Sequence, residues 1–392
     1  MPRAAGDFAG SRETERMDYT TIDTPEALRE LAQTLRAEPL LGVDTEAAGY
    51  HRYFDRLSLL QVSSRTQNWL VDPLAVEDLS PLKEVLEDPS IEKIFHDADY
   101  DLRILDRDAG MGISGLFDTQ IAAAFLGERA LGLGTIVEKH LGIKLPKEFQ
   151  RADWAERPLS EGMKQYAATD TAHLPDLRDR LKAALEQMGR LHWAQEEFLR
   201  REGTRWTEPE DGKEAFMRIK GARDLAPRGL AILRELHAWR EGVARERDQA
   251  TFRILGNQAL LEMSASPPGS MRDLPSVTGI SEGLAQRRGR DILAAVQRGL
   301  DVPEDQLPRW PRGQRFERDP EQEARFEALR DARTRLADQL NLDAGFLIPR
   351  ATLEEIARAQ PRTIDELAQV PGVRTWQVEA VGQGLLKAIN RG

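Results

Sequence analysis

The pattern of apolar and polar positions divides the chain into two parts. In the first half, short apolar runs alternate with helical patterns, which is typical of an α/β domain. Strands are predicted at residues 40–43, 57–63, 68–71 and 91–95, with a short strand or turn at 116–117. Helices are predicted at residues 75–86, 99–108, 133–141 and 160–187, and another begins at residue 119. A polar turn joins the second and third strands, so the sheet is expected to begin as a meander.

From about residue 212 onward, the pattern predicts only helices and loops, and it repeats. A shift of 93 residues aligns Leu260 with Leu353 and Gly279 with Gly372, without a gap. Each copy is predicted to form a helix, a turn with proline, a short helix, a glycine turn and a final helix. Two copies are too few for a solenoid, so the repeat predicts two tandem helical domains.

The predicted organisation has five parts. They are a disordered tail at residues 1–17, an α/β domain at 18–210, a first helical domain at 211–300, a linker at 301–320 and a second helical domain at 321–392. The tail lacks the apolar centre of a signal peptide. The linker is rich in proline, arginine and acidic residues, which is typical of a segment between domains.

Composition indicates the compartment of the protein, and its net charge bears on whether the protein can bind nucleic acid. Cysteine is absent, which excludes disulfides and thiolate metal sites and fits a reducing cytoplasm. No apolar run approaches the roughly 18–20 residues that cross a bilayer, so we expect a cytoplasmic protein without a membrane partner. Of the net charge of −11, residues 211–392 contribute about +2 and residues 1–210 about −13. Such an acidic half can bind a polyanion if cations neutralise its carboxylates.

The first candidate chemistry is an acidic pair at the end of a predicted strand. Asp44 and Glu46 are separated by one residue, so on a strand they point to the same face and can share a cation. An acidic pair after a strand is also common in solvated loops. Next in the chain, His51, Tyr53 and Phe54 could stack on a terminal base or pack in a core, and the sequence leaves both open.

Two further acidic groups follow. Asp97, Asp99 and Asp101 lie where a strand meets a helix, and the helix dipole alone would explain acids in a first turn, with Asp97 as the cap. Tyr166 and Asp170 are four residues apart on a predicted helix and therefore share a face. An exposed tyrosine–aspartate pair would show the same spacing.

Taken together, the three groups predict a metal-dependent phosphodiesterase. Carboxylates from several elements can converge on two divalent ions roughly 3.5–4 Å apart, which stabilise the attacking and leaving oxygens of phosphodiester hydrolysis. Oxygen ligands without cysteine favour Mg²⁺ or Mn²⁺ over zinc.

The motifs resemble a known family. The elements D-x-E at Asp44, a later H-x4-D-L ending at Leu102, and Y-x3-D at Tyr166 resemble the DEDD exonuclease superfamily in its tyrosine-bearing branch. The segments LFDTQ (116–120), KEFQRADWAERPL (147–159) and QYAATD (165–170) narrow the resemblance to ribonuclease D, over roughly residues 20–205. The helical repeats resemble the HRDC domain shared by RecQ helicases and ribonuclease D.

This resemblance implies a ribonuclease H-like α/β exonuclease domain with a mixed sheet, followed by two small all-α HRDC domains. It implies that Asp44, Glu46, Asp101 and Asp170 bind two divalent cations, with Asp97 and Asp99 structural. Tyr166 would orient or deprotonate the attacking water. The implied activity is 3′→5′ hydrolysis of RNA with an accessible 3′ end, with tRNA precursors as substrates and nucleoside 5′-monophosphates as products. We expect a monomer.

Basic residues outside these motifs are candidates for phosphate contact. Lys147 and Arg151 precede the third motif, and a cluster of Arg287, Arg288 and Arg290 lies in the first helical domain. Solvated loops and helix surfaces show the same composition.

Two alternative functions differ in class or substrate. The first is a DNA 3′→5′ exonuclease in repair, since HRDC domains also occur in RecQ helicases. The chain lacks a G-x4-G-K-[ST] loop and is therefore not itself a helicase. The second alternative is a catalytically silent nucleic-acid-binding protein, against which all five motif positions are filled.

Overall fold

A mixed six-stranded sheet forms the centre of the N-terminal part. The structure is a computed structural model that describes residues 16–208, 212–310 and 319–390. The strand order is β1-β4-β3-β2-β5-β6, in which β2, β3 and β4 are antiparallel and the other neighbours are parallel. The strands are β1 (Thr20–Ile22), β2 (Leu40–Ala47), β3 (Leu57–Ser63), β4 (Asn68–Val71), β5 (Glu92–Phe95) and β6 (Leu116–Asp118). The predicted mixed α/β fold and the meander of β2, β3 and β4 are confirmed, but the sheet does not begin with it. Strand β1, which was not predicted, precedes the meander and pairs in parallel with β4.

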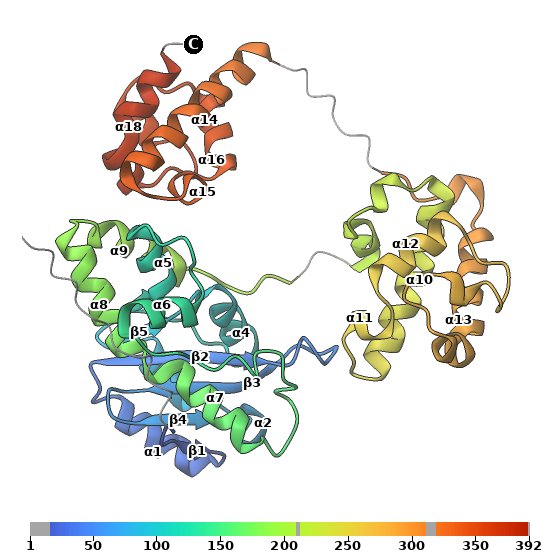
Figure 1. Cartoon of the computed structure of the whole chain (residues 1–392), viewed down its shortest axis with the longest axis horizontal. Helices are drawn as coiled ribbons and strands as arrows, with labels where there is room; N and C mark the ends of the chain where they lie inside the picture. The colour runs from blue at the N-terminus through green and yellow to red at the C-terminus, as the bar shows by residue number, and fades with distance from the viewer. Residues whose placement is uncertain (1–15, 209–211, 311–318, 391–392) are drawn as a thin grey trace, which may run out of the picture.

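Nine helices among residues 16–208 surround this sheet (Figure 1). They are α1 (Pro25–Leu35), α2 (Pro73–Val76), α3 (Lys83–Leu86), α4 (Asp99–Ala109), α5 (Thr119–Phe125), α6 (Leu133–Leu141), α7 (Glu161–Ala172), α8 (Leu174–Gln187) and α9 (Leu191–Glu202). Helix α7 packs across β2, β3 and β4. This close approach requires Gly42 in β2, because a Cβ there would lie 2.8 Å from the carbonyl oxygen of Thr171.

Two predicted helices are interrupted. The helix predicted at 160–187 is divided into α7 and α8 at His173, since Pro175 in the first turn of α8 cannot donate a backbone hydrogen bond. The helix predicted at 75–86 is divided into α2, a 3₁₀ turn and α3, and Glu77 between them has a φ of +61°. The strand β2 continues to Ala47, so Asp44 and Glu46 lie within it and not after it.

The two helical units repeat with the predicted period. The first, residues 212–310, contains α10 (Pro227–Glu246), α11 (Thr251–Ile254), α12 (Asn257–Ala265) and α13 (Glu282–Leu300). The second, residues 319–390, contains α14 (Pro320–Leu340), α15 (Ala344–Leu347), α16 (Arg350–Ala359), α17 (Ile364–Ala368) and α18 (Thr375–Ile389). The starts of α10, α11, α12 and α13 each lie 93 residues before those of α14, α15, α16 and α18.

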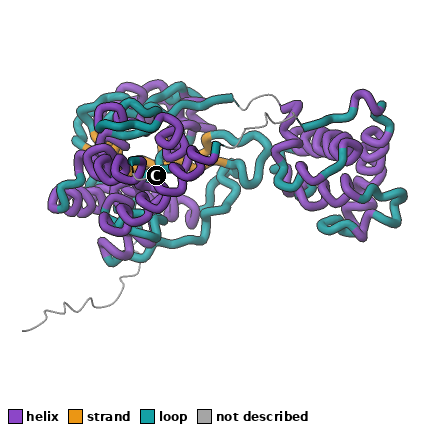
Figure 2. Tube along the Cα trace, turned by 90° about the horizontal axis from the view of Figure 1, so that it is seen from above, coloured by secondary structure: helices purple, strands orange, loops and turns teal. Residues whose placement is uncertain are grey.

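The second helical unit shares an apolar core with the α/β unit. Trp376 in α18 packs against Phe125 and Trp193, with ring centroids 4.9 and 5.7 Å apart, and its indole NH donates to Glu197 over 2.9 Å. Arg374, at the start of α18, pairs with the same glutamate over 3.1 Å. The first helical unit has a separate apolar core and lies beside the α/β unit (Figures 1 and 2).

Parts of the predicted organisation fall outside the described residues. The predicted tail is described only at Arg16 and Met17, and the Met17 backbone exchanges two hydrogen bonds with Gln165 on α7. Of the predicted linker, residues 311–318 are not described, while Trp310 packs against the core of the first helical unit. Within the described ranges, no helix combines the length and apolar character that a membrane span needs.

Candidate active site and metal centre

Strand β2 presents two carboxylates on one face of the sheet. Asp44 pairs in register with Gln61 of β3, and Glu46 pairs with Leu59, before a register shift between Glu46 and Ala47 ends the regular pairing. Because residues alternate along a strand, Asp44 and Glu46 lie on the same face, while the intervening Thr45 points to the other.

Helix α7 brings the third carboxylate onto this face. Ser160 caps α7 by accepting a hydrogen bond from the backbone NH of Met163. Near the other end of the helix, Asp170 faces β2, and carboxylate oxygens of Asp44, Glu46 and Asp170 all lie within 4.8 Å of one another. These three acidic residues, from a strand and a helix about 125 positions apart, can therefore hold a metal ion.

Asp101 and Tyr166 border this cluster. Asp101, on α4, is buried and accepts hydrogen bonds from the backbone NH and the hydroxyl of Thr45, over 3.1 and 2.5 Å. It is thus attached to β2 between the two strand carboxylates. Tyr166, one turn before Asp170 on α7, is buried with Trp154 and Phe149 beside its ring.

The electrostatics of the cluster reflect crowded negative charge. Burial, together with the charges of the neighbouring carboxylates, raises the pKa of Asp44 and Glu46 well above the ordinary range. Burial raises the pKa of Asp101 and of Asp170 from 3.8 to about 7. For Tyr166, burial and the charges of Asp170 and Glu46 raise the pKa of the phenol. Neighbouring carboxylates repel one another when ionised, and a bound cation offsets this repulsion.

These pKa shifts predict how stability depends on pH and metal. An acid whose pKa is higher in the folded state stabilises the fold below its unfolded pKa, and this contribution is lost as pH rises through the folded pKa. For Asp101 and Asp170 the window runs from about pH 4 to about pH 7. In EDTA, the melting temperature should therefore fall between about pH 4 and about pH 7. Mn²⁺ should reverse the loss, by about 2.7 kcal/mol at one hundred times Kd.

Asp44→Asn is the matched variant for this measurement. It removes one charge from the cluster, so it should melt higher than the wild type in EDTA at pH 8 and gain much less from Mn²⁺. Equal Mn²⁺-induced shifts in the two proteins would contradict a metal site at Asp44.

The structure separates the three acids of the second group. Asp99 pairs with Arg103 over 2.9 Å and with Arg201 over 2.5 Å, so it links α4 to α9. Asp97 was predicted to cap the helix, and this is wrong. Asp118 accepts hydrogen bonds from the backbone NH groups of Asp97 and its neighbour Ala98 instead, and Asp97 has a φ of +62°. Such a backbone position places the Asp97 side chain outside the regular helix.

A cleft of about 710 Å³ opens beside the acidic cluster. Its lining includes Glu46, Tyr50 and Tyr100 from the α/β unit and Glu241 and Phe252 from the first helical unit. Tyr50 and Phe252 were missed by the sequence reasoning. The only available signal was that Tyr50 closely follows the first acidic pair, because nothing in the local sequence of Phe252 indicates that its helix reaches this cleft.

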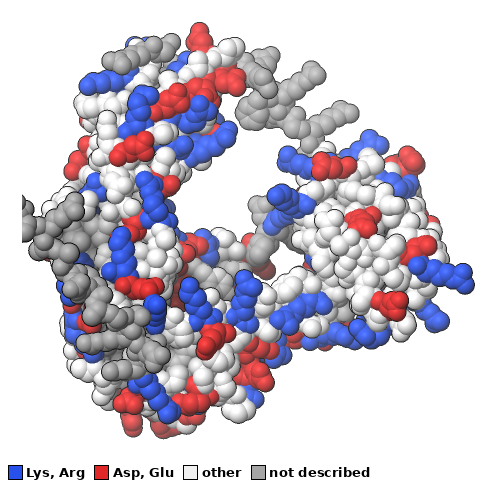
Figure 3. Space-filling model, viewed as in Figure 1, with Lys and Arg blue, Asp and Glu red and all other residues white. Residues whose placement is uncertain are grey.

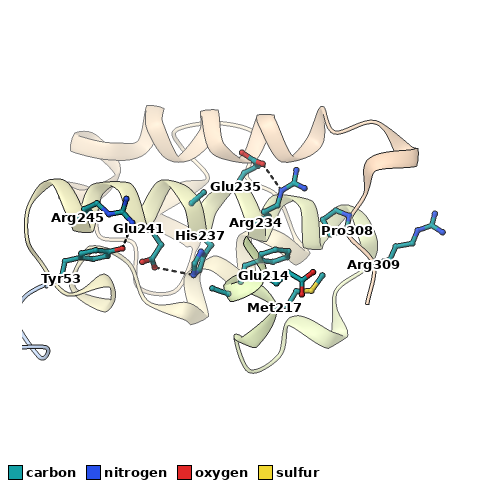
Figure 4. Close-up of a pocket in the computed structure, with 13 residues that line it drawn as sticks. Tyr53, Glu214, Met217, Arg234, Glu235, His237, Glu241, Arg245, Pro308 and Arg309 are labelled. Atoms are coloured by element: carbon teal, nitrogen blue, oxygen red, sulfur yellow. Dashed lines mark hydrogen bonds and ion pairs between the residues drawn. The ribbon is translucent and has the colours of Figure 1, made fainter. Parts of the chain in front are cut away.

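A second cavity, of about 830 Å³, lies in the first helical unit (Figure 4). Tyr53 and Glu241 line both cavities, so the two adjoin. The charged groups along the second cavity are largely paired. His237 lies 3.5 Å from Glu241, and Arg245 donates to the Tyr53 hydroxyl over 3.2 Å.

The predicted basic and aromatic residues differ in whether they lie near the two cavities. Neither Arg151 nor Lys147 lines the cleft, but the Arg151 guanidinium lies 5.5 Å from the centre of the ring of Tyr50, which does, whereas Lys147 is exposed. Arg287, Arg288 and Arg290 lie on α13 and line neither cavity. Their contact with phosphate remains a prediction. Of the aromatic residues after the first acidic pair, Tyr53 lines the cleft and Phe54 does not.

Figure 3 shows how charge is distributed over the viewed face. Lysine and arginine side chains alternate with acidic ones, and several basic side chains border the opening between the three units. The candidate metal cluster itself is acidic, whereas the guanidinium groups of Arg151 and Arg253 lie beside Tyr50 of the adjoining cleft and could attract a polyanionic substrate.

Two family models match the chain and define its class. A 3′–5′ exonuclease model matches residues 19–186, which include all five residues of the candidate site. A model of the HRDC domain matches residues 229–296 and again 322–389. The protein is therefore a DEDD exonuclease with two HRDC domains.

Similar proteins identify the family within this class. The chain is 31% identical over 365 residues to ribonuclease D of Pseudomonas paraeruginosa, covering 93% of this chain and 95% of that protein. It is 36% identical over 297 residues to ribonuclease D of Escherichia coli, covering 74% and 78%. The crystal structure of Escherichia coli RNase D, an exoribonuclease involved in structured RNA processing, matches with a TM-score of 0.67 at 31% identity, covering 96% and 99%. The chain belongs to the ribonuclease D family of 3′–5′ exoribonucleases.

Proposed function

We propose that this exoribonuclease hydrolyses RNA 3′ ends by a two-metal mechanism at the carboxylate cluster. The convergence of the Asp44, Glu46 and Asp170 oxygens within 4.8 Å carries the proposal. Asp101 is attached to the same strand through Thr45, and Tyr166 lies on the helix that supplies Asp170.

The donor set fits divalent cations. Its oxygens are hard ligands without histidine or cysteine, which favours Mg²⁺ or Mn²⁺. Burial, followed by the neighbouring carboxylate charges, raises the pKa of Asp44 and Glu46, and a bound cation would favour their ionised forms. When bound, two such ions would polarise the phosphodiester and stabilise the charge that develops on the attacking and leaving oxygens.

Each residue has a role that follows from its position. Asp44, Glu46 and Asp170 would hold the ion on the side of the attacking water. Asp44 would also contribute to the second ion, which Asp101 would support directly or through water. The phenol of Tyr166 would orient or deprotonate the attacking water. Because the two strand carboxylates and Asp170 belong to rigid elements, the scissile phosphate would be positioned without rearrangement of a loop.

The substrate and products follow from the exonuclease class. We infer that the enzyme shortens tRNA precursors from the 3′ end and releases nucleoside 5′-monophosphates. Its similarity to an exoribonuclease involved in structured RNA processing supports this choice of substrate.

A digestion comparison tests the proposal. A precursor tRNA with a short 3′ extension, and a DNA of matched sequence, would be incubated with the protein in Mg²⁺ and in EDTA. We expect stepwise shortening of the RNA in Mg²⁺ only, with 5′-monophosphates as products and little digestion of the DNA. Faster digestion of DNA would support the repair exonuclease instead, and activity in EDTA would contradict the metal mechanism.

A further inference from the structure

The first HRDC domain holds the loop that follows the metal-binding strand. The backbone NH of Ala250 donates to the carbonyl of His51 over 3.0 Å. Arg253, on α11, donates to the carbonyl of Tyr50 over 3.1 Å. Helix α11 therefore lies directly against residues 49–55, and through them it reaches the cleft beside the acidic cluster.

The helix that corresponds to α11 in the second HRDC domain makes different contacts. There, α15 is the counterpart of α11, and its aromatic residue Phe346 is covered by Phe125 and Trp376 at centroid distances of 4.8 and 6.3 Å. In α11 the aromatic residue is Phe252, whose counterpart 93 residues later is Gly345. Phe252 is 50% exposed although its helix lies at a domain contact. Packing between the domains therefore leaves about half of Phe252 exposed, with the Arg253 guanidinium 5.9 Å from its ring centre.

Phe252 forms an exposed aromatic pair with the α/β domain. Its ring centroid lies 5.2 Å from that of Tyr50, which is itself 43% exposed, and both rings line the cleft that contains Glu46. The guanidinium groups of Arg151 and Arg253 lie 5.5 and 5.4 Å from the centre of the Tyr50 ring. Exposed aromatic rings flanked by cations are the combination that binds single-stranded nucleic acid, since the rings stack on bases and the cations attract phosphates.

We propose that Phe252 and Tyr50 form a stacking site for a nucleobase on the 5′ side of the scissile phosphodiester. The first HRDC domain thereby completes the substrate cleft of the exonuclease domain. In an exonuclease the 3′-terminal nucleotide lies innermost, at the metal-binding carboxylates, so the strand enters from the outer end of the cleft. Because Phe252 and Tyr50 are both about half exposed, we assign them to that outer part, where they would meet an upstream base. The inference rests on the proposed function, because it assumes RNA in this cleft.

Steady-state kinetics of the full-length protein on two substrates test this role. One substrate is an unstructured decaadenylate. The other is the methyl ester of uridine 5′-monophosphate, which has neither an upstream base nor an aromatic leaving group. Phe252→Ala should raise the KM for decaadenylate roughly 5- to 150-fold, the range for loss of one base–aromatic stack. Its kcat/KM for the ester should stay within about twofold of the wild type. Phe252→Leu should resemble the alanine variant and Phe252→Trp the wild type, because only tryptophan restores an aromatic face.

Phe54→Ala is the matched control. Phe54 is 52% exposed in the same loop and does not line the cleft, so its truncation should leave both substrates unaffected. Melting temperatures would establish that every variant is folded. Four results would each overturn the stacking site. They are an unchanged KM in Phe252→Ala, an equal loss of kcat/KM on both substrates, wild-type kinetics in Phe252→Leu, and an equal loss of kcat/KM in Phe54→Ala. A wild type that fails to shorten RNA would overturn the proposed function itself.

Discussion

Replacing Asp170 by asparagine should abolish RNA hydrolysis while leaving the fold intact. The substitution keeps the shape of the side chain but removes one ligand charge from the three-carboxylate cluster. The expected loss of turnover is on the order of 10³-fold or more, at least that of removing one group that stabilises the transition state. Because the change also relieves repulsion among buried carboxylates, the melting temperature in EDTA should be equal to or above that of the wild type.

The measurement is single-turnover digestion of a 3′-extended RNA in saturating Mg²⁺. Retention of more than a few per cent of the wild-type rate would show that the site is wrongly assigned. A folded, inactive Asp170→Asn protein would in addition separate loss of chemistry from loss of structure.

The acids of α4 supply matched substitutions for this assay. Asp101→Asn should be severe, because this residue lies against β2 at Thr45. Asp99→Asn should be nearly neutral for activity, since Asp99 pairs with Arg103 and Arg201 away from the cluster. The reverse ranking would show that Asp99, and not Asp101, serves the metal site.

Local patterns predicted most elements because each depends on neighbouring residues. The strands at 57–63 and 68–71 and the helix at 133–141 have the predicted bounds, since their apolar runs are flanked by turn residues or glycine. The division of the predicted helix at 160–187 was missed, because the apolar pattern continues through Pro175 although proline cannot donate a backbone hydrogen bond. The start of each main helix in the repeat was predictable, because an ungapped shift of 93 residues preserves these starts and the turn at Gly279 and Gly372.

The site was less predictable because it depends on contacts between distant segments. The D-x-E and Y-x3-D spacings predicted shared faces, and the structure brings Asp44, Glu46 and Asp170 together. By contrast, no local signal distinguishes Asp101 from Asp97. The hydrogen bonds from Thr45, 56 residues away, and the backbone contact of Asp97 with Asp118 make that distinction. The contribution of α11 to the cleft depends on how two domains pack, which residue spacing does not encode.

The two HRDC domains have the same elements but different contacts. The second is joined to the exonuclease domain by an aromatic cluster around Trp376, where stability depends on buried apolar area. The first is joined to the loop at 49–55 by hydrogen bonds and by the packing of Tyr53 against a small apolar cluster, and it leaves Phe252 half exposed in the cleft. One copy of the repeat therefore serves mainly the fold, and the other borders the active site.

Replacing Tyr166 by phenylalanine should lower turnover by about 10²–10⁴-fold without weakening metal binding. The ring would keep its contacts with Trp154 and Phe149, at centroid distances of 6.1 and 6.2 Å, so the fold should be retained. Only the hydroxyl is lost, and the proposal assigns that group to the attacking water and not to an ion.

Two readouts separate these effects in the Tyr166→Phe protein. Its kcat should fall, while the Mn²⁺ concentration for half-maximal activity and the Mn²⁺-induced rise in melting temperature should stay at wild-type values. Tyr19→Phe is the matched control, because the Tyr19 hydroxyl donates to Glu161 at the start of the same helix over 2.8 Å, away from the carboxylates. That variant should retain full activity. An unchanged kcat in Tyr166→Phe would reduce the tyrosine to a packing role, and a parallel loss of Mn²⁺ affinity would place its oxygen among the metal ligands.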